Sequence, residues 1–132
     1  DAAAASIAYY SRRLADSAVS MPQMLVAMDR SRAAPRHVVI AGDPASPATR
    51  DLIAQFSRRF LPDDRLLVVD GGEGQRRLAK LAPFVAPLAA LGGRATAYVC
   101  VDYACRLPVE DPETFGAQLD ERPAEPAAKR EG

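Results

Sequence analysis

The sequence predicts an α/β protein, in which a helical hairpin precedes a three-stranded, mainly parallel sheet with flanking helices. Three short runs rich in β-branched residues, at 37–41, 65–69 and 95–101, are separated by segments with apolar residues at helical spacing. Strands joined through helices normally lie parallel, with right-handed connections. Before residue 35 the chain instead has helix-forming alanines and no such run. These observations favour a parallel sheet after a hairpin.

Three parts are expected along the chain. Residues 1–34 form the helical hairpin, with Ser20 as the N-cap of its second helix and Pro22 in that helix's first turn. Residues 35–121 form a small α/β module, and residues 122–132, rich in Pro, Ala and Glu, form a disordered tail. With 132 residues and no initial Met, the chain is expected to be one domain or a piece of a longer protein.

Each element of the module has a local signal. The expected order is strand 37–42, helix from 47, strand and turn 65–72, helix 73–82, strand 95–101 and a last helix after Pro112. Ser46 is the predicted N-cap of the first of these helices, with Pro47 at its first position, and Asp111 opens the last one. The connection 84–91, which contains Pro87, has no clear assignment.

Composition excludes several classes of partner. Seventeen basic residues balance seventeen acidic ones, so no strong field would attract nucleic acid or an anionic membrane. The apolar runs are shorter than the roughly 20 residues that span a bilayer. Arg58, Arg59, Arg76 and Arg77 are expected to form solvated helix faces, offset by nearby carboxylates. Neither a metal nor another cofactor is expected, and the expected location is the cytoplasm.

The two cysteines are the first candidate site. A turn after Cys100 could return Cys105 to within the separation that a disulfide requires. The pair could therefore be a redox site, or two buried, reduced structural cysteines. The second interpretation is preferred because the spacing is not C-x-x-C and no neighbouring Lys or His would lower a thiol pKa.

The turns after the strands are the second candidate site. Asp43, Asp70 and Asp102 would lie at one edge of a parallel sheet, where a divalent ion, a sugar or a nucleotide could bind. Gly and Asp are also ordinary turn residues, and no phosphate-binding glycine motif is present, so turns without a ligand are preferred. His37 lies at the start of a strand, away from that edge, and is expected to be structural.

Three segments carry a resemblance to a known family. Pro22–Asp29, Val38–Gly42 and above all Thr96–Pro108, with its Y-V-C-x4-C-x-x-P core, resemble the C-terminal end of the large thioredoxin-domain-containing proteins of the spermatogenesis-associated type, found in animals and bacteria. The resemblance implies an upstream thioredoxin-like domain and a toroid of paired helices similar to the sugar epimerases. Residues 1–34 would then be the end of that toroid. Of the family motif, only Cys100, Cys105 and Pro108 are matched residue by residue.

The functional hypothesis follows from this resemblance. Because the family's thioredoxin motif and toroid cavity lie outside this chain, no catalytic residue is carried over. The expected role is a non-catalytic C-terminal module whose partners are the upstream domains of the same chain. A thiol-redox element at Cys100 and Cys105, and a sugar or nucleotide site at the sheet edge, are the alternatives. Whether the chain is part of an enzyme stays open, and exposed apolar helix surface could lead to self-association.

Overall fold

The computed structural model describes residues 2–32, 36–102 and 104–121. These residues divide into two compact units, one helical unit within 2–32 and one α/β unit within 36–121. The predicted tail at 122–132 lies outside the described residues.

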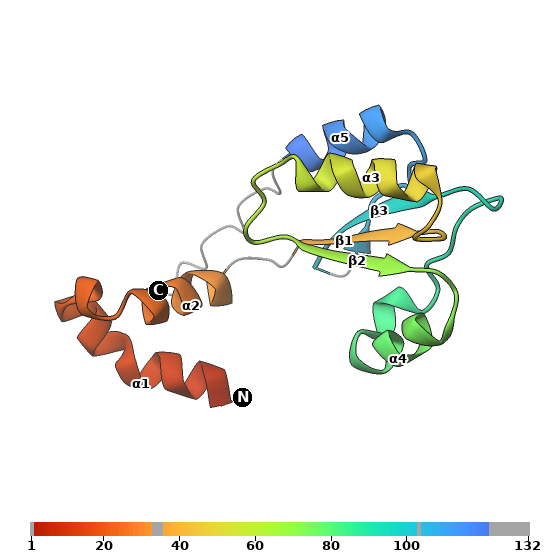
Figure 1. The fold of residues 1–132 in the computed structure, drawn as a ribbon. Helices are drawn as coiled ribbons and strands as arrows, with labels where there is room; N and C mark the ends of the chain where they lie inside the picture. Colours follow the sequence, from red (N-terminus) through yellow and green to blue (C-terminus); the bar gives the residue numbers. More distant parts are fainter. Residues whose placement is uncertain (1, 33–35, 103, 122–132) are drawn as a thin grey trace. The chain divides into compact units, whose positions relative to one another are not determined.

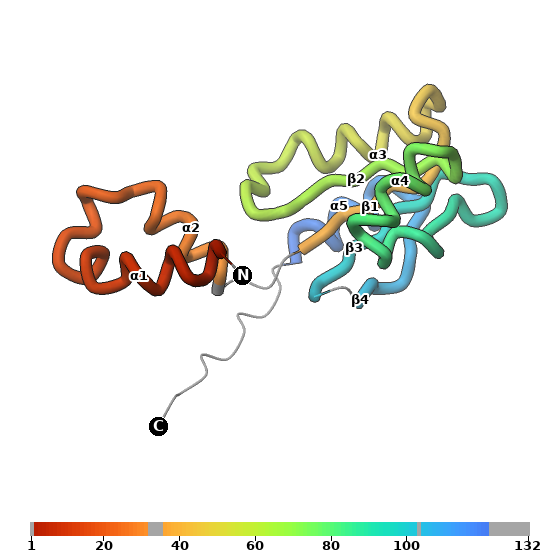
Figure 2. Tube along the Cα trace, turned by 90° about the horizontal axis from the view of Figure 1, so that it is seen from below, coloured from red at the N-terminus to blue at the C-terminus, as the bar shows by residue number. Residues whose placement is uncertain are grey.

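The helical unit is a hairpin, as predicted. It consists of α1 (Ala2–Asp16), the short 3₁₀ helix η1 (Ala18–Ser20) and α2 (Pro22–Arg32). α1 and α2 lie side by side (Figure 2). Ser20 does not cap α2, because its hydroxyl donates to the Ser17 carbonyl oxygen at 2.8 Å within η1. Among the described residues of this unit, Leu14 alone is fully buried, so the unit has a very small core of its own.

The α/β unit contains a four-stranded mixed sheet (Figure 1). Its elements are β1 (Arg36–Ala41), α3 (Pro47–Ser57), β2 (Arg65–Val69), α4 (Glu73–Leu81), the 3₁₀ helix η2 (Pro83–Val85), β3 (Thr96–Val101), β4 (Ala104–Cys105) and α5 (Pro112–Asp120). The strand order is β2-β1-β3-β4. Only β1 and β2 are parallel, whereas β3 runs antiparallel to both β1 and β4. The prediction of a three-stranded, mainly parallel sheet was therefore wrong.

The connection between α4 and β3 explains the reversed strand. Phe84 lies at the start of β1, where its ring centroid is 5.1 Å from that of His37. Thr96, the first residue of β3, pairs with Ala41 at the other end of β1. Residues 85–95 thus travel the length of the strand before β3 begins, so β3 can only return antiparallel. The connection 84–91, to which the sequence analysis assigned no structure, thus lies in the part of the chain that sets the direction of β3.

Polar side chains hold this connection against the sheet. The Gln75 side chain is buried in α4 and donates from Nε2 to the carbonyl oxygens of Val85, at 2.9 Å, and Leu88, at 2.8 Å. Further along, the Tyr98 hydroxyl donates to the Ala89 carbonyl oxygen at 2.6 Å. Buried backbone carbonyls need such partners, so these bonds fix the course of the connection.

The two faces of the sheet have separate cores. Because successive side chains of a strand alternate between faces, β1 contributes to both. α3 and α5 cover one face, whose buried core includes Val38, Ile40, Leu52, Phe115 and Leu119 (Figure 1). α4 and η2 cover the other face. Its buried core comprises Val39, Ala41, Val69, Val85, Tyr98 and Cys100. β1 is buried along its whole length, which confirms the prediction of a strand covered on both faces.

The buried side chain of Arg36, at the start of β1, connects this strand with two other segments of the chain. The Arg36 guanidinium donates to the Asp64 carboxylate and to the carbonyl oxygens of Leu119, at 3.0 Å, and Glu121, at 2.9 Å. Arg36 and Asp64 are 6% and 10% exposed, so this is a buried ion pair with further hydrogen bonds. No local pattern in the sequence indicates this pairing, because the partners of Arg36 lie 28 to 85 residues away along the chain.

Candidate functional site

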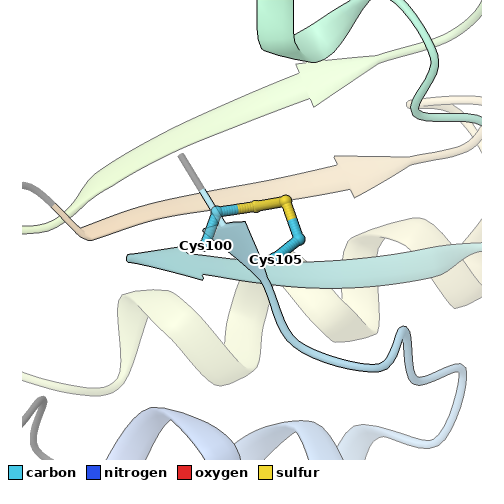
Figure 3. Close-up of a disulfide and its surroundings, with 2 residues drawn as sticks. All are labelled: Cys100 and Cys105. Atoms are coloured by element: carbon cyan, nitrogen blue, oxygen red, sulfur yellow. A yellow bond between two sulfur atoms is a disulfide. The ribbon is translucent and has the colours of Figure 1, made fainter. Parts of the chain in front are cut away.

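The cysteines lie on a tight hairpin between β3 and β4 (Figure 3). Val101 pairs with Ala104 and Cys100 pairs with Cys105, with Asp102 in the turn at a φ of 49°. Asp is one of the few non-glycine residues that adopt this left-handed conformation readily. The turn places the two cysteines directly opposite each other on neighbouring strands.

A disulfide bond joins Cys100 to Cys105. The preferred sequence interpretation, two reduced core cysteines, therefore does not describe this structure. Cys100 is fully buried, but Cys105 is exposed. The two residues thus belong to different environments, Cys100 in the core beneath α4 and η2 and Cys105 at the edge of the sheet.

His37 lies next to this pair in the sheet. It is the register partner of Cys100 across β1 and β3, and the alternation of side chains places both on the face that α4 and η2 cover. Directly opposite residues have their Cβ atoms about 4.5–5.5 Å apart. No Lys or His adjoins either cysteine along the chain, so the sequence alone did not reveal that His37 lies opposite Cys100.

Burial, and then the positive charge of Arg65, lowers the pKa of His37. Arg65 is the register partner of His37 on β2. The imidazole is therefore neutral near neutral pH, and a neutral imidazole carries one N–H donor and one acceptor nitrogen. An N–H donor of this kind can stabilise a thiolate that forms beside it.

The disulfide contributes modestly to stability. It closes a loop with a sequence separation of 5, and the chain-entropy model gives about 2 kcal/mol for so short a loop. Both residues of β4 are exposed, so little core packing depends on that strand. The bond is thus not a major support of the fold.

The three candidate carboxylates do not share one edge. Asp43 and Asp70 follow β1 and β2, which are parallel, and so both lie at the carboxyl end of those strands. Asp102 follows β3, whose last residue, Val101, pairs with Arg36 at the start of β1. Asp102 therefore lies at the opposite end of the sheet. The expectation of one shared edge was wrong because β3 is antiparallel.

Asp43 and Asp70 each bind their own turn. An Asp43 carboxylate oxygen accepts from the Ala45 backbone N–H at 2.9 Å, and one of Asp70 accepts from the Gly72 N–H at 2.7 Å. In the same turn, the Gly71 N–H donates to the Gln75 side-chain amide oxygen at 2.7 Å. These are the local bonds that make Asp common in turns. The geometry fits the preferred interpretation, in which these residues shape turns.

Two of the four surface arginines have acidic partners. Arg59 binds Asp120 at 2.7 Å, and Arg77 binds Glu73 at 2.8 Å one helical turn away. The hydrogen bond with Arg59 and its positive charge lower the pKa of Asp120. The partner of Arg59 was not predicted, because α3 and α5 pack together only in the fold.

Two kinds of feature are absent from the described residues. They contain no group of three or more His, Cys, Asp or Glu side chains placed to hold a metal ion. None of the helices within these residues has both the length and the apolar character needed to cross a bilayer.

Comparison with known proteins gives one relationship. The chain is similar to spermatogenesis-associated protein 20. It is 31% identical to the Homo sapiens protein over 103 residues, and 29% and 28% identical to the Rattus norvegicus and Mus musculus proteins over the same length. The match covers 78% of this chain but 13% of each relative. No model of a known protein family matches the chain, and no solved structure shows significant similarity.

The similarity supports part of the sequence-based resemblance. It connects the chain with the spermatogenesis-associated proteins, and it corresponds to a small part of a much longer polypeptide. The match does not show the thioredoxin-like domain or the helical toroid that the resemblance implies.

Proposed function

We propose that this chain is a non-catalytic, C-terminal module of a larger, cytoplasmic, thioredoxin-domain-containing protein. The observation that supports it most is the similarity to a 13% portion of spermatogenesis-associated protein 20. In this proposal residues 2–32 are the last helices of a toroid, and the α/β unit is appended to it. The module stabilises the toroid through contacts within the longer chain.

The surface of the helical unit supports such contacts. Beside the buried Leu14, four apolar side chains of this unit are exposed: Tyr9, Val19, Leu25 and Val26. Large apolar side chains that so small a unit leaves exposed are available to a protein segment that covers them. The remainder of the longer chain would bury these side chains and complete the small core.

Hydrogen exchange tests this proposal. We expect the amides of α1 and α2 to exchange at least about tenfold more slowly in the longer protein than in the 132-residue chain, because packing suppresses local opening. Val26→Asp should remove this protection, whereas Ser31→Asp, at an exposed polar position of the same helix, should leave it unchanged. Equal exchange in the two proteins would contradict the proposal. If the protection instead rises with the concentration of the isolated chain, the exposed apolar surface binds a second copy of this chain.

A second function is favoured by one specific observation, the disulfide with its exposed Cys105. In this candidate the pair cycles between dithiol and disulfide, as a thiol-redox element. The folded protein should then release two thiols on treatment with a dithiol reductant while its far-UV circular dichroism stays the same. A disulfide that opens only when the protein unfolds would eliminate this candidate.

A further inference from the structure

The two cysteines of the disulfide differ in exposure. Thiol-disulfide exchange requires a thiolate to reach one sulfur directly. Cys100 is 0% exposed beneath α4 and η2, whereas Cys105 belongs to the exposed edge strand β4. An external thiolate can therefore reach only the Cys105 side of the bond in the folded protein.

The backbone around Cys105 offers a second contact. Arg106 donates its backbone N–H to the Val99 carbonyl oxygen at 2.9 Å, so Val99 and Arg106 form a hydrogen-bonded pair of the antiparallel ladder. Hydrogen-bonded and non-hydrogen-bonded pairs alternate along such a ladder, so the next pair, Cys100 with Cys105, is not hydrogen-bonded. In an antiparallel ladder the residues of a non-hydrogen-bonded pair direct their own N–H and C=O groups away from each other. The Cys105 backbone thus points away from β3, toward the open edge, where an extended peptide can bind it.

An exposed apolar side chain lies close by along the chain. Leu107, two residues after Cys105, is 85% exposed. A small thiol would gain little from this leucine or from the open strand edge, whereas a protein would gain from both. These features favour a polypeptide as the source of the attacking thiol.

From these features we infer that the β3–β4 hairpin is a docking and exchange site for a protein dithiol, with Cys105 as the attacked sulfur and Cys100 as the leaving sulfur. The inference rests on the thiol-redox function proposed second above, and it adds the direction of attack and the class of partner.

The exchange proceeds in two balanced steps. A partner thiolate attacks Cys105 Sγ, so a mixed disulfide forms, the bond to Cys100 Sγ breaks, and the electron pair leaves on Cys100 opposite His37. The second partner thiol then attacks the partner's own sulfur in the mixed disulfide and releases Cys105. The partner's dithiol is oxidised by two electrons to a disulfide, and its two protons end on the Cys100 and Cys105 thiols. A partner disulfide would run the same steps in reverse.

Trapping tests the direction of attack. The probe is a thioredoxin-class dithiol protein whose second active-site cysteine is replaced by serine, so that the mixed disulfide accumulates. With the oxidised, folded chain we expect the adduct on Cys105 in at least about nine of ten molecules, mapped by alkylation of the released thiol and mass spectrometry. No adduct on the folded protein would remove both the inference and the thiol-redox function. An adduct mainly on Cys100 would overturn the inference alone.

A pair of variants tests the class of partner. Leu107→Asp should slow reduction by the intact protein dithiol at least about fivefold but leave reduction by glutathione unchanged. Leu81→Asp is the matched control, because Leu81 is 87% exposed at the end of α4 and should affect neither rate. Equal rates for Leu107→Asp and the unaltered chain with the protein dithiol would overturn docking at this hairpin. Circular dichroism confirms that each variant is folded.

Discussion

The two ends of the sheet differ in how their polar residues are used. At the carboxyl end of β1 and β2, Asp43 and Asp70 bind backbone groups two residues away, so each turn is built from its own segment. At the opposite end, Arg36, His37 and Cys100 meet partners that are distant in the sequence. The carboxyl end of β1 and β2 has the clearer sequence signals, and its aspartates make the local hydrogen bonds that are usual in turns. The end with weak signals brings together a buried ion pair, a histidine and a disulfide.

The largest expected effect concerns the buried ion pair. Arg36→Met would leave the Asp64 carboxylate and two carbonyl oxygens without their donor, and breaking one side of a buried pair typically costs about 3–5 kcal/mol. Urea unfolding should show a loss of that size in the free energy of unfolding. The control is Arg77→Met, because this exposed pair within one helix should contribute less than about 1 kcal/mol. Similar losses for both variants would show that the two ion pairs do not differ as their burial suggests.

The next effect concerns the turn after β1. A Cβ at Gly42 would lie 2.6 Å from Thr49 Oγ1 and 3.3 Å from the Ala95 backbone, and Thr49 is fully buried. Gly42→Ala should therefore destabilise the α/β unit by about 1–3 kcal/mol, the usual cost of overpacking. Gly74→Ala is the matched control, since a Cβ there meets nothing within 4 Å inside α4 and should be neutral or stabilising. Thermal unfolding of both variants measures the difference, and equal destabilisation would contradict this packing.

A smaller effect should appear in the pH dependence of stability. Because the pKa of His37 is lowered in the folded state, the unfolded chain binds the proton more readily. The contribution of His37 to the free energy of unfolding should therefore be fully present above the ordinary histidine pKa of about 6.5. It should decrease as the pH falls from there toward the lowered pKa of the folded state. The His37→Gln variant should lose this part of the slope in urea unfolding between pH 7.5 and 5. An unchanged slope would mean that the pKa of His37 is the same in the folded and the unfolded state.

The smallest effect is expected at the carboxyl end. Asp70→Ala removes one exposed hydrogen bond to the Gly72 N–H and should cost about 0.5–1.5 kcal/mol. Asp70→Asn keeps an acceptor oxygen and should cost less. Chemical denaturation of the two variants checks the order. Equal losses for the two variants would mean that the charge, which both remove, matters there and the hydrogen bond of the turn does not.

Elements defined by local chemistry were predictable from the sequence. Ser46 accepts from the Thr49 N–H at 3.1 Å, and Asp111 accepts from the Thr114 N–H at 2.7 Å, so both helices begin where their capping residues indicated. A cap needs only residues within one turn of helix. The first two strands and the burial of β1 were likewise visible as short apolar runs.

What the sequence did not reveal depends on contacts between distant segments. The direction of β3 follows from a connection held by Gln75 and Tyr98, and no periodicity records such bonds. The strand β4 has only two residues, too few for a pattern. His37 meets Cys100 only through the pairing of β1 with β3. The candidate site therefore depended on the direction of β3, which the sequence pattern predicted wrongly.

The redox state of Cys100 and Cys105 in the folded protein decides whether the hairpin takes part in thiol exchange. Thiol alkylation and mass spectrometry across a series of glutathione ratios would measure it, with circular dichroism recorded at each ratio. The account predicts an intramolecular disulfide that opens at the reducing end of the series while the fold persists, with Cys105 alkylated well before the buried Cys100. Two cysteines that stay reduced at every ratio would contradict it and remove the thiol-redox role of the pair.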